Sequence, residues 1–311
     1  MSDASPGLHH VTAICGHPRA NRDFYVDTLG LRLVKKTVNF DDPGTYHLYY
    51  GDQYGTPGSA LTFFPFVQAA AGRPGRGEPA DLVWAVAPGS LDYWAERLGN
   101  DAGVAIERGA RFGTPRLSFS DPHGLSLALV ETDWAAAING SAGGDVPAQH
   151  ALRNFFGTTI RVADPAPTVR VLREVFGFED VAEEGPSRRL QAEGGAGVGA
   201  VVDVLGAPEA PVHRQGAGSI HHVAFRARDV EHQTVLRERA QSLGLSPTPV
   251  IDRQYFESVY FREPGGALFE IATDGPGFTV DEPVETLGGQ LKLPPQYEAQ
   301  RPAIEAQLPL I

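Results

Sequence analysis

Two pairs of adjacent histidines and one glutamate are the side chains of this 311-residue sequence best suited to chemistry. The pairs are His9 and His10 in LHHV, and His221 and His222 in IHHV, while Glu270 stands in ALFEIAT. Two imidazoles and one carboxylate on one face of a metal ion are a ligand set of non-haem iron enzymes, and this set leaves positions open for substrate and O2. Ten histidines beside one cysteine and one methionine point to the same ligand types.

Strand alternation selects one histidine from each pair, because successive side chains of a strand point to opposite faces. His9 and His221 share a face with the more apolar neighbours, so we expect them to point toward a covering helix on the convex side. His10 and His222 are then expected to face the concave side, where a ligand can enter. Glu270 alternates with two large apolar residues that favour the core. The sequence therefore predicts a metal site formed by His10, His222 and Glu270.

The elements that must position these residues repeat four times along the chain. Each copy opens with a short apolar strand, continues into a helix and ends in further strands rich in β-branched and aromatic residues. The first copy opens at LHHVTAIC with a helix predicted over Pro18–Leu29, and the fourth opens at SIHHVAFRA with a helix over Asp229–Leu243. Such a unit cannot close a core alone, so we expect the copies to pair into curved sheets.

A glycine-rich stretch at residues 139–149, NGSAGGDVPAQ, predicts a linker between two halves of similar length. We therefore expect an N-terminal domain over residues 1–138 and a C-terminal domain over residues 150–275, each with two copies of the repeat. Residues 276–311 are rich in proline and glutamine, and they predict an extended arm with one short helix.

The overall composition narrows the class of protein. A net charge of −12 argues against a surface that binds nucleic acid. No apolar run approaches the ~20 residues that cross a bilayer, and the start MSDASPGLHH lacks the basic and apolar regions of a secretory signal. We therefore expect a cytoplasmic protein without a membrane or nucleic-acid partner. The single cysteine excludes a disulfide framework within the chain.

Several alternatives to this metal site stay open. One HH pair alone is more often a strand-end pair with local hydrogen bonds, although two matched pairs and a strand glutamate favour a metal. Asp203 in AVVDVLG occupies the position in the third copy that corresponds to Glu270 in the fourth. It is therefore the alternative carboxylate ligand. His47 is expected to be a pocket wall rather than a ligand. Surface or turn positions are expected for the remaining candidates, His17, His123, His213 and His232.

At greater length the sequence resembles the hydroquinone ring-cleaving dioxygenases of the vicinal oxygen chelate superfamily, which also contains glyoxalases and bleomycin resistance proteins. The first copy carries the likeness from LHHVTAICGHPRANRDFYVDTLGLRLVKK to SALTFFPF. The motifs SIHHVAFRA, DRQYFESVYFREPGGALFEIATD and LPPQYE extend it over nearly the whole chain. The resemblance implies an α+β fold in which four βαβββ modules are paired into two domains with curved mixed sheets.

The same resemblance implies Fe(II) as the cofactor, with Mn(II) as the alternative, and His10, His222 and Glu270 as its ligands. The active-site residues that it implies besides the ligands are Tyr260, Arg253, His221, His9 and Thr12. For His9 and His221 this role rests on the resemblance alone, because alternation places both on the convex side. Tyr260 and Glu270 flank a PGG turn at an even separation, which predicts a hairpin with both on one face.

The function implied by the resemblance is ring cleavage of a substituted hydroquinone with both atoms of O2. The partners are then a small aromatic substrate and O2, and the chain could form a homo-oligomer. Two other functions stay open, a metal-dependent isomerase resembling glyoxalase I and a non-catalytic protein that binds a small aromatic compound or an antibiotic. Candidate pocket walls, with core packing favoured for the first two, are Phe63, Phe64, Tyr255 and Phe256.

Overall fold

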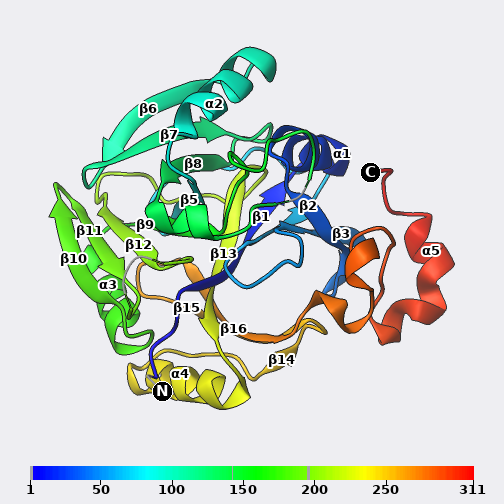
Figure 1. Cartoon of the computed structure of the whole chain (residues 1–311). Helices are drawn as coiled ribbons and strands as arrows, with labels where there is room; N and C mark the ends of the chain where they lie inside the picture. Colours follow the sequence, from blue (N-terminus) through cyan, green and yellow to red (C-terminus); the bar gives the residue numbers. More distant parts are fainter. Residues whose placement is uncertain (1–2, 142, 195–196) are drawn as a thin grey trace.

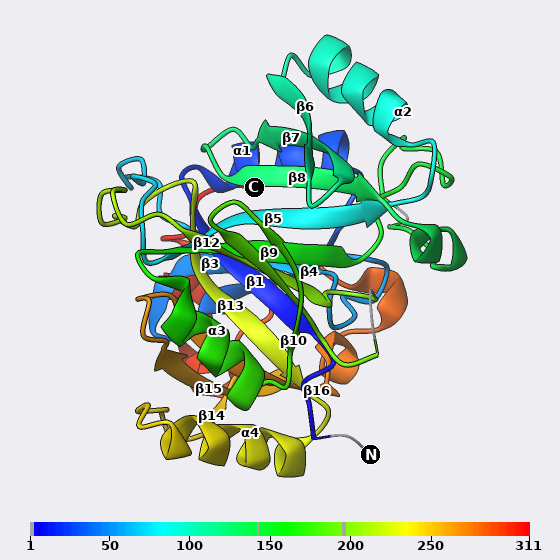
Figure 2. The same ribbon diagram turned by 90° about the vertical axis from the view of Figure 1, so that its left-hand side faces the viewer.

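The computed structural model describes residues 3–141, 143–194 and 197–311, and it consists mainly of strands with few helices (Figure 1). The strands form two curved sheets of eight strands each, and Figure 2 shows the two sheets from the side. Both sheets mix parallel and antiparallel pairs. The predicted α+β fold with four βαβββ modules and curved mixed sheets is confirmed.

The first sheet combines the first and the fourth module. Its two central strands are antiparallel to each other, and each is flanked by a parallel strand of its own module. In spatial order the strands are β14 (Ile251–Asp252), β15 (Phe256–Arg262), β16 (Leu268–Pro276), β13 (Ser219–Ala227), β1 (Leu8–Cys15), β4 (Ala60–Pro65), β3 (Asp42–Gly51) and β2 (Arg32–Asn39).

The second sheet combines the second and the third module around the antiparallel pair β9 and β5. In spatial order its strands are β10 (Glu179–Glu184), β11 (Ser187–Gln191), β12 (Val201–Gly206), β9 (Phe155–Val162), β5 (Glu78–Val86), β8 (Ser126–Glu131), β7 (Thr114–Ser120) and β6 (Ile106–Arg111). Each sheet therefore takes one module from each half of the sequence. The two predicted domains, residues 1–138 and 150–275, therefore do not form one sheet each.

The predicted linker, residues 139–149, packs against the first module. Its Ser141 is buried and its hydroxyl donates to the carbonyl of Gly51 at 3.4 Å. Ala142, within the same stretch, lies outside the described residues. The glycines of this segment thus allow close packing against neighbouring backbone, for example Gly144 beside the carbonyl of Val26.

Each module contributes one helix. These are α1 (Pro18–Arg22), which continues as a π-helical stretch over Asp23–Thr28, α2 (Leu91–Glu96), which continues over Arg97–Asp101, α3 (Pro165–Glu174) and α4 (Val230–Ser242). The predicted helix over Pro18–Leu29 matches the first of these closely, since Pro18 fits the first turn and Gly30 follows with a left-handed backbone, φ 71°.

The main core fills the space between the sheets and their helices. Its largest fully buried side chains include Trp84, Trp94 and Tyr25, and the rings of Phe176 and Phe225 stack with centroids 4.0 Å apart. Burial of aromatic side chains on this scale contributes strongly to stability. This packing occupies one face of the first sheet and leaves its concave face free to form a site.

On the concave face of the second sheet, arginine and aspartate side chains lie beside an apolar cluster that includes Val83, Phe156 and Val201. Asp203 accepts from Arg189 through both carboxylate oxygens, at 2.8 and 2.9 Å, and lies 3.2 Å from Arg111. The space left beside them is about 10 Å³, too small for a substrate. The alternative ligand Asp203 therefore belongs to an ion-pair cluster, away from the two histidine pairs.

The C-terminal arm, residues 276–311, packs along β2 and β3 and appears in orange and red in Figure 1. It contains the predicted short helix, α5 (Arg301–Glu305), and three further 3₁₀ turns, Phe278–Val280, Val284–Thr286 and Pro295–Gln300. Lys35 of β2 is fully buried, and its ammonium donates to Asp281 at 2.6 Å and to Glu282 at 2.9 Å. This buried ion pair ties the arm to the first sheet.

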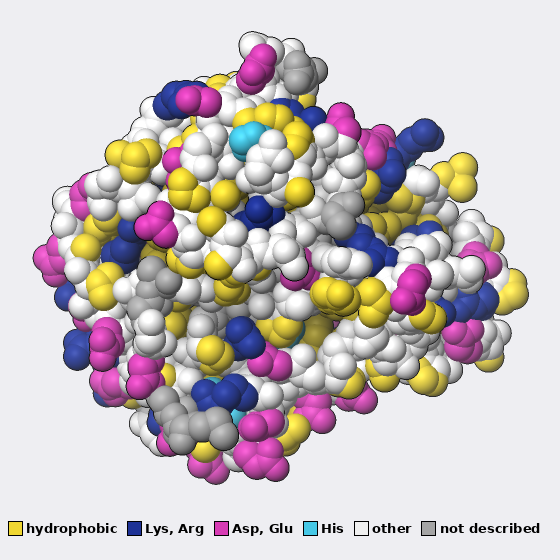
Figure 3. Space-filling model, in the orientation of Figure 1, with side chains coloured by type: hydrophobic (Ala, Val, Ile, Leu, Met, Phe, Trp, Pro, Cys, Tyr) yellow, Lys and Arg dark blue, Asp and Glu magenta, His cyan; other side chains and the backbone are white. Residues whose placement is uncertain are grey.

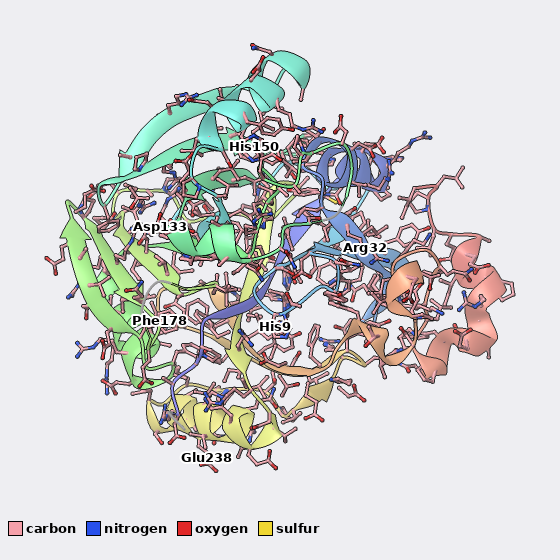
Figure 4. All side chains as sticks on the ribbon, in the orientation of Figure 1. His9, Arg32, Asp133, His150, Phe178 and Glu238 are labelled. Atoms are coloured by element: carbon pink, nitrogen blue, oxygen red, sulfur yellow. The ribbon has the colours of Figure 1, made fainter. Side chains whose placement is uncertain are left out.

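Two further contacts link the arm to the first module. Figure 4 shows Arg32 beside the arm, and its guanidinium donates to the carbonyl of Val284 at 2.6 Å. The hydroxyl of Tyr297 donates to the carbonyl of Phe40 at 2.8 Å. Phe40 lies in the turn between β2 and β3, so the arm holds that turn in place.

The outer surface carries charges of both signs. On the face in Figure 3, acidic and basic side chains lie side by side with hydrophobic side chains scattered among them. Among the described residues, no helix has the length and the apolar character needed to cross a membrane.

Candidate metal centre and its cavity

The two HH pairs lie on the neighbouring strands β1 and β13, and each pair includes a β-bulge. In the register of these strands Thr12 stands opposite His222, and the pairing skips His9 and His221. A bulge places an extra residue in a strand and re-aims the side chains around it. The predicted convex position of His9 and His221 is therefore wrong. Both lie on the concave side, and Figure 4 shows His9 near the centre of the molecule.

The structure brings the side chains of His10, His222 and Glu270 together. Atom Nε2 of His222 lies 2.9 Å from Oε2 of Glu270, and Nε2 of His10 lies 3.2 Å from the same oxygen. The two Nε2 atoms are 3.3 Å apart. All three residues are buried, with exposed fractions of 4% or less. Three potential ligand atoms from three adjacent strands thus converge on one point.

The chemistry of these atoms fits a cation. Within the described chain, Oε2 of Glu270 is buried and accepts no well-oriented hydrogen bond, although the Nε2 atoms of His222 and His10 lie 2.9 and 3.2 Å away. Such an arrangement costs free energy unless a positive charge compensates it. Burial acts to raise the pKa of Glu270, but the imidazoles of His10 and His222 outweigh burial and hold this pKa well below its usual range. Burial lowers the pKa of His222. An ionised carboxylate beside neutral imidazole is the state that binds a divalent metal.

The first histidine of each pair orients the second. The Nδ1 atoms of His9 and His10 are 2.9 Å apart, and those of His221 and His222 are 2.8 Å apart. Burial lowers the pKa of His9, and burial followed by the charge of His222 lowers the pKa of His221 to about 3, so both rings are neutral acceptors. A histidine that offers Nε2 to a metal carries its proton on Nδ1 and donates from there.

Ser258 on β15 is a site residue that the sequence did not reveal. Its hydroxyl donates to Oε1 of Glu270 at 2.5 Å, and both side chains are fully buried. This bond fixes the carboxylate so that Oε2 faces the two imidazoles. The sequence offered one clue to this role. Ser258 precedes Tyr260 by two residues, so both side chains lie on the same face of the strand.

Replacing Ser258 by alanine is expected to weaken metal binding by roughly 10- to 100-fold, because partners that orient a ligand contribute on that scale. The measurement is a titration of the metal-free protein with Fe(II) in the absence of oxygen. Ser242→Ala is the matched control, since this hydroxyl lies on the surface of α4 and donates to the carbonyl of Glu238. Equal affinity in Ser258→Ala and the parent would show that Glu270 needs no such support.

Tyr260 lies beside the three converging residues. It stands opposite Glu270 in the register of β15 and β16, so the predicted hairpin is confirmed. Its ring centroid is 5.6 Å from that of His222, and the guanidinium of Arg253 lies 5.5 Å from the Tyr260 ring. Burial and then the charge of Glu270 raise the pKa of Tyr260, and Arg253 opposes them only in part. Tyr260 therefore keeps its phenolic proton near neutral pH.

The turn of this hairpin is held by a buried carboxylate. Glu263 accepts from the backbone N–H groups of Gly265 and Ala267 at 2.8 Å each, and from the hydroxyl of Thr168 on α3 at 2.7 Å. These bonds fix where β16 begins, and with it the position of Glu270 opposite Tyr260. The third module thus supports the fourth at the metal centre.

A cavity of about 480 Å³ opens beside the converging side chains. The predicted site residues that line it are His10, His222, His221, Arg253 and Tyr260. His9 and Thr12 lie behind this wall. The other residues that line the cavity are Ile14, Asn39, Phe40, Asp41, His47, Tyr49, Phe64, Phe66, Gln215, Phe256 and Leu268. Most of these are apolar or aromatic, as is typical of a pocket for a small aromatic ligand.

The four predicted aromatic walls divide between cavity and core. Phe64 and Phe256 line the cavity, although core packing was favoured for Phe64. Phe63 is fully buried in the main core, as expected. Tyr255 packs behind Phe256 and donates to Asp281 of the arm at 3.0 Å. The arm therefore supports the cavity wall from behind.

The remaining histidines lie away from the converging residues, except His47. His47 lines the cavity, as predicted. His17 is exposed at the start of α1, and His123 and His213 are half-buried. The predicted surface position of His232 is wrong, because the N-terminal segment covers it and its Nε2 lies 3.2 Å from the carbonyl of Asp3.

This chain is similar to known proteins over nearly its whole length. Residues 7–129 and 154–271 match the model of the Glyoxalase/Bleomycin resistance protein/Dioxygenase superfamily. The Bacillus subtilis protein MhqO, named provisionally as a ring-cleaving dioxygenase, is 44% identical over 310 residues, which is 99% of this chain and 97% of MhqO. The chlorohydroquinone/hydroquinone 1,2-dioxygenase of Sphingobium indicum is 36% identical over 300 residues, 94% of this chain and 92% of that protein.

One solved structure resembles this chain over its full length. It is a crystal structure of a provisionally named dioxygenase from Bacillus subtilis, with 43% sequence identity and a TM-score of 0.94. The match covers 100% of this chain and 98% of the other. Sequence and fold thus agree on the same group of relatives.

Proposed function

This chain belongs to the Glyoxalase/Bleomycin resistance protein/Dioxygenase superfamily, and we propose that it opens the ring of a hydroquinone with O2 at an Fe(II) ion held by His10, His222 and Glu270. The observation that carries the proposal is the buried convergence of two imidazoles and one carboxylate beside a largely apolar cavity. The relatives named as ring-cleaving dioxygenases, which match nearly the whole chain, support the same reaction class. Mn(II) accepts this ligand set as well.

The cavity provides the setting for an aromatic substrate. Fe(II) at the three ligands would supply open positions for O2 and a substrate oxygen and the one-electron chemistry that joins them. The rings of Phe64 and Phe256 offer flat walls to a substrate ring. Held in this way, the substrate reacts from a fixed orientation, which can contribute a large share of the rate.

We propose that two side chains of the fourth module control the protonation and the negative charge of the substrate. Arg253 brings a permanent positive charge to the cavity wall and stabilises a substrate phenolate. Tyr260 retains its hydroxyl and exchanges a hydrogen bond or a proton with a substrate oxygen. His221 lines the cavity from β13, so its free nitrogen is a further hydrogen-bonding group for the substrate.

Replacing Tyr260 by phenylalanine is expected to leave metal binding unchanged and to lower turnover by roughly 10²-fold, the lower end of what a proton-transferring group contributes. The substitution keeps the ring packed against His222 and removes only the hydroxyl. The measurement is kcat as a function of pH, compared between Tyr260→Phe and the parent. If turnover and pH dependence match the parent, Tyr260 is a packing residue.

The test of the proposed function is O2 uptake by the protein after reconstitution with Fe(II) under anaerobic conditions. We expect uptake in proportion to added methylhydroquinone or chlorohydroquinone, one O2 for each ring opened. No uptake with any hydroquinone or catechol would contradict the proposal. Turnover of a hemithioacetal by the zinc-loaded protein would favour an isomerase of the glyoxalase I type instead.

A further inference from the structure

A row of polar side chains crosses the concave face of the first sheet, from the metal-binding strands to the opposite cavity wall. On β1, Thr12 stands opposite His222 of β13 on one side and opposite Thr62 of β4 on the other. Thr62 in turn stands opposite Tyr49 of β3. The sheet register therefore places these four residues in line across four adjacent strands.

Hydrogen bonds join three members of this row to His47. The hydroxyls of Thr12 and Thr62 are 2.8 Å apart, and Oγ1 of Thr62 is 2.8 Å from Nε2 of His47. The other ring nitrogen, Nδ1, lies 2.9 Å from the hydroxyl of Tyr49. The two threonines are fully buried, whereas His47 and Tyr49 line the cavity. The result is a continuous chain of four side chains that ends at the cavity.

The chain holds His47 in one orientation. Its ring lies between those of Tyr49 and Phe64, with centroids 4.1 and 4.3 Å away. Burial, followed by the charges of His10, His222 and Arg253, lowers the pKa of His47, and burial raises the pKa of Tyr49. A neutral imidazole donates from one nitrogen and accepts at the other, so the directions of all the hydrogen bonds are coupled.

Tyr49 has hydrogen-bonding capacity that the chain does not use. A phenolic hydroxyl offers one donor and two acceptor positions, and the bond to His47 occupies one of the three. When Tyr49 donates to His47, it can accept from a ligand hydroxyl. When it accepts from His47, it can donate to an ionised or carbonyl oxygen.

The position of Tyr49 matches the shape of a 1,4-diol. The two hydroxyls of a hydroquinone point to opposite ends of the ring, so the second is directed away from a metal centre that holds the first. Strand β3 lies two strands from β1, roughly 10 Å at the usual strand spacing. Tyr49 lines the same cavity as His10 and His222 from this more distant strand, where the second hydroxyl requires a partner.

We propose that Tyr49, oriented by His47, Thr62 and Thr12, binds the ring hydroxyl that is remote from the metal centre, and that this contact makes the cavity selective for 1,4-diols. The inference rests on the proposed function, because it assumes that one ring hydroxyl lies at His10, His222 and Glu270. A site built to hydrogen-bond a hydroxyl discriminates against analogues that lack it, since its own polar group is then left unpaired.

The experiment compares equilibrium binding of hydroquinone and of phenol, which lacks the second hydroxyl, to Fe(II)-reconstituted protein without oxygen. We expect the parent to prefer hydroquinone. Tyr49→Phe should bind hydroquinone roughly five- to tenfold more weakly and phenol unchanged, as the loss of one hydrogen bond predicts. Thr62→Val leaves His47 and Tyr49 in place but removes the hydroxyl that bonds to Nε2 of His47. This variant should reduce the preference for hydroquinone over phenol by about threefold.

Tyr50→Phe is the matched control for Tyr49→Phe. Tyr50 is the next residue on β3, is fully buried in the main core, and among the described residues its hydroxyl has no hydrogen-bond partner. This variant should keep the parent's preference. An undiminished preference for hydroquinone in Tyr49→Phe would overturn the inference and leave the proposed function intact. A parent that binds neither ligand and takes up no O2 with hydroquinone would overturn both.

Discussion

Replacing His10 or His222 by alanine, or Glu270 by glutamine, is expected to remove bound iron and to lower O2 uptake with hydroquinone by more than about 10²-fold. The three atoms concerned converge within 3.3 Å of one another. Each alanine deletes one of the two imidazole nitrogens, and glutamine removes the negative charge of the carboxylate. Loss of a ligand changes both the charge and the geometry at the ion, so the effect should exceed the 10- to 100-fold typical of residues that only orient a ligand. The measurements are iron content after reconstitution and O2 uptake.

Two other histidines provide controls for this prediction. His17 is exposed at the start of α1, and His123 is half-buried in a turn between β7 and β8. His17→Ala and His123→Ala should keep parental iron content and activity. Iron retained at the parental level in all three ligand variants would refute the assignment of His10, His222 and Glu270.

The second large effect concerns the two halves of the chain. A protein that begins at Gly144 is expected to be inactive, because His10 lies in the missing half while His222 and Glu270 lie in the half that remains. The structure adds a reason why this half should also be unstable. Strand β13 loses its partner β1 and strand β9 loses its partner β5, which leaves the two central strands with open edges.

Circular dichroism and O2 uptake test this prediction, with the complementary N-terminal half, residues 1–143, added in a second sample. Recovery of activity on mixing would show that the halves pair as the sheet order requires. Full activity of the C-terminal half alone would contradict a metal centre built from both halves.

The three converging residues could be predicted from sequence because strand alternation is a local rule. It placed His10 and His222 on the concave side, and the even spacing of Tyr260 and Glu270 indicated the hairpin that β15 and β16 form. The same rule failed for His9 and His221. A bulge interrupts the alternation at each, and bulges depend on pairing with the neighbouring strand, which sequence does not display.

The pairing of the modules was beyond the reach of local patterns. A glycine-rich stretch indicated two halves, yet the central strands pair across them, β1 with β13 and β5 with β9. Such contacts join strands that lie far apart along the chain. Strands such as β10, with the sequence EDVAEE, also lacked an apolar pattern because they are largely exposed.

Ser258 and Tyr49 show why part of the site escaped detection. Ser258 acts through its bond to Glu270, and Tyr49 through its bond to His47. Threonine and tyrosine are common in strands for packing reasons alone. Their role depends on which strand lies next to theirs, and that becomes visible only in the sheet register.

The most direct test of the metal centre is anomalous scattering at the iron absorption edge from a crystal of the Fe(II)-reconstituted protein. We predict one strong peak between Nε2 of His10, Nε2 of His222 and the carboxylate of Glu270, at about 2 Å from each ligand atom. An iron peak elsewhere in the molecule, or no peak at these three side chains after reconstitution, would contradict the proposed centre.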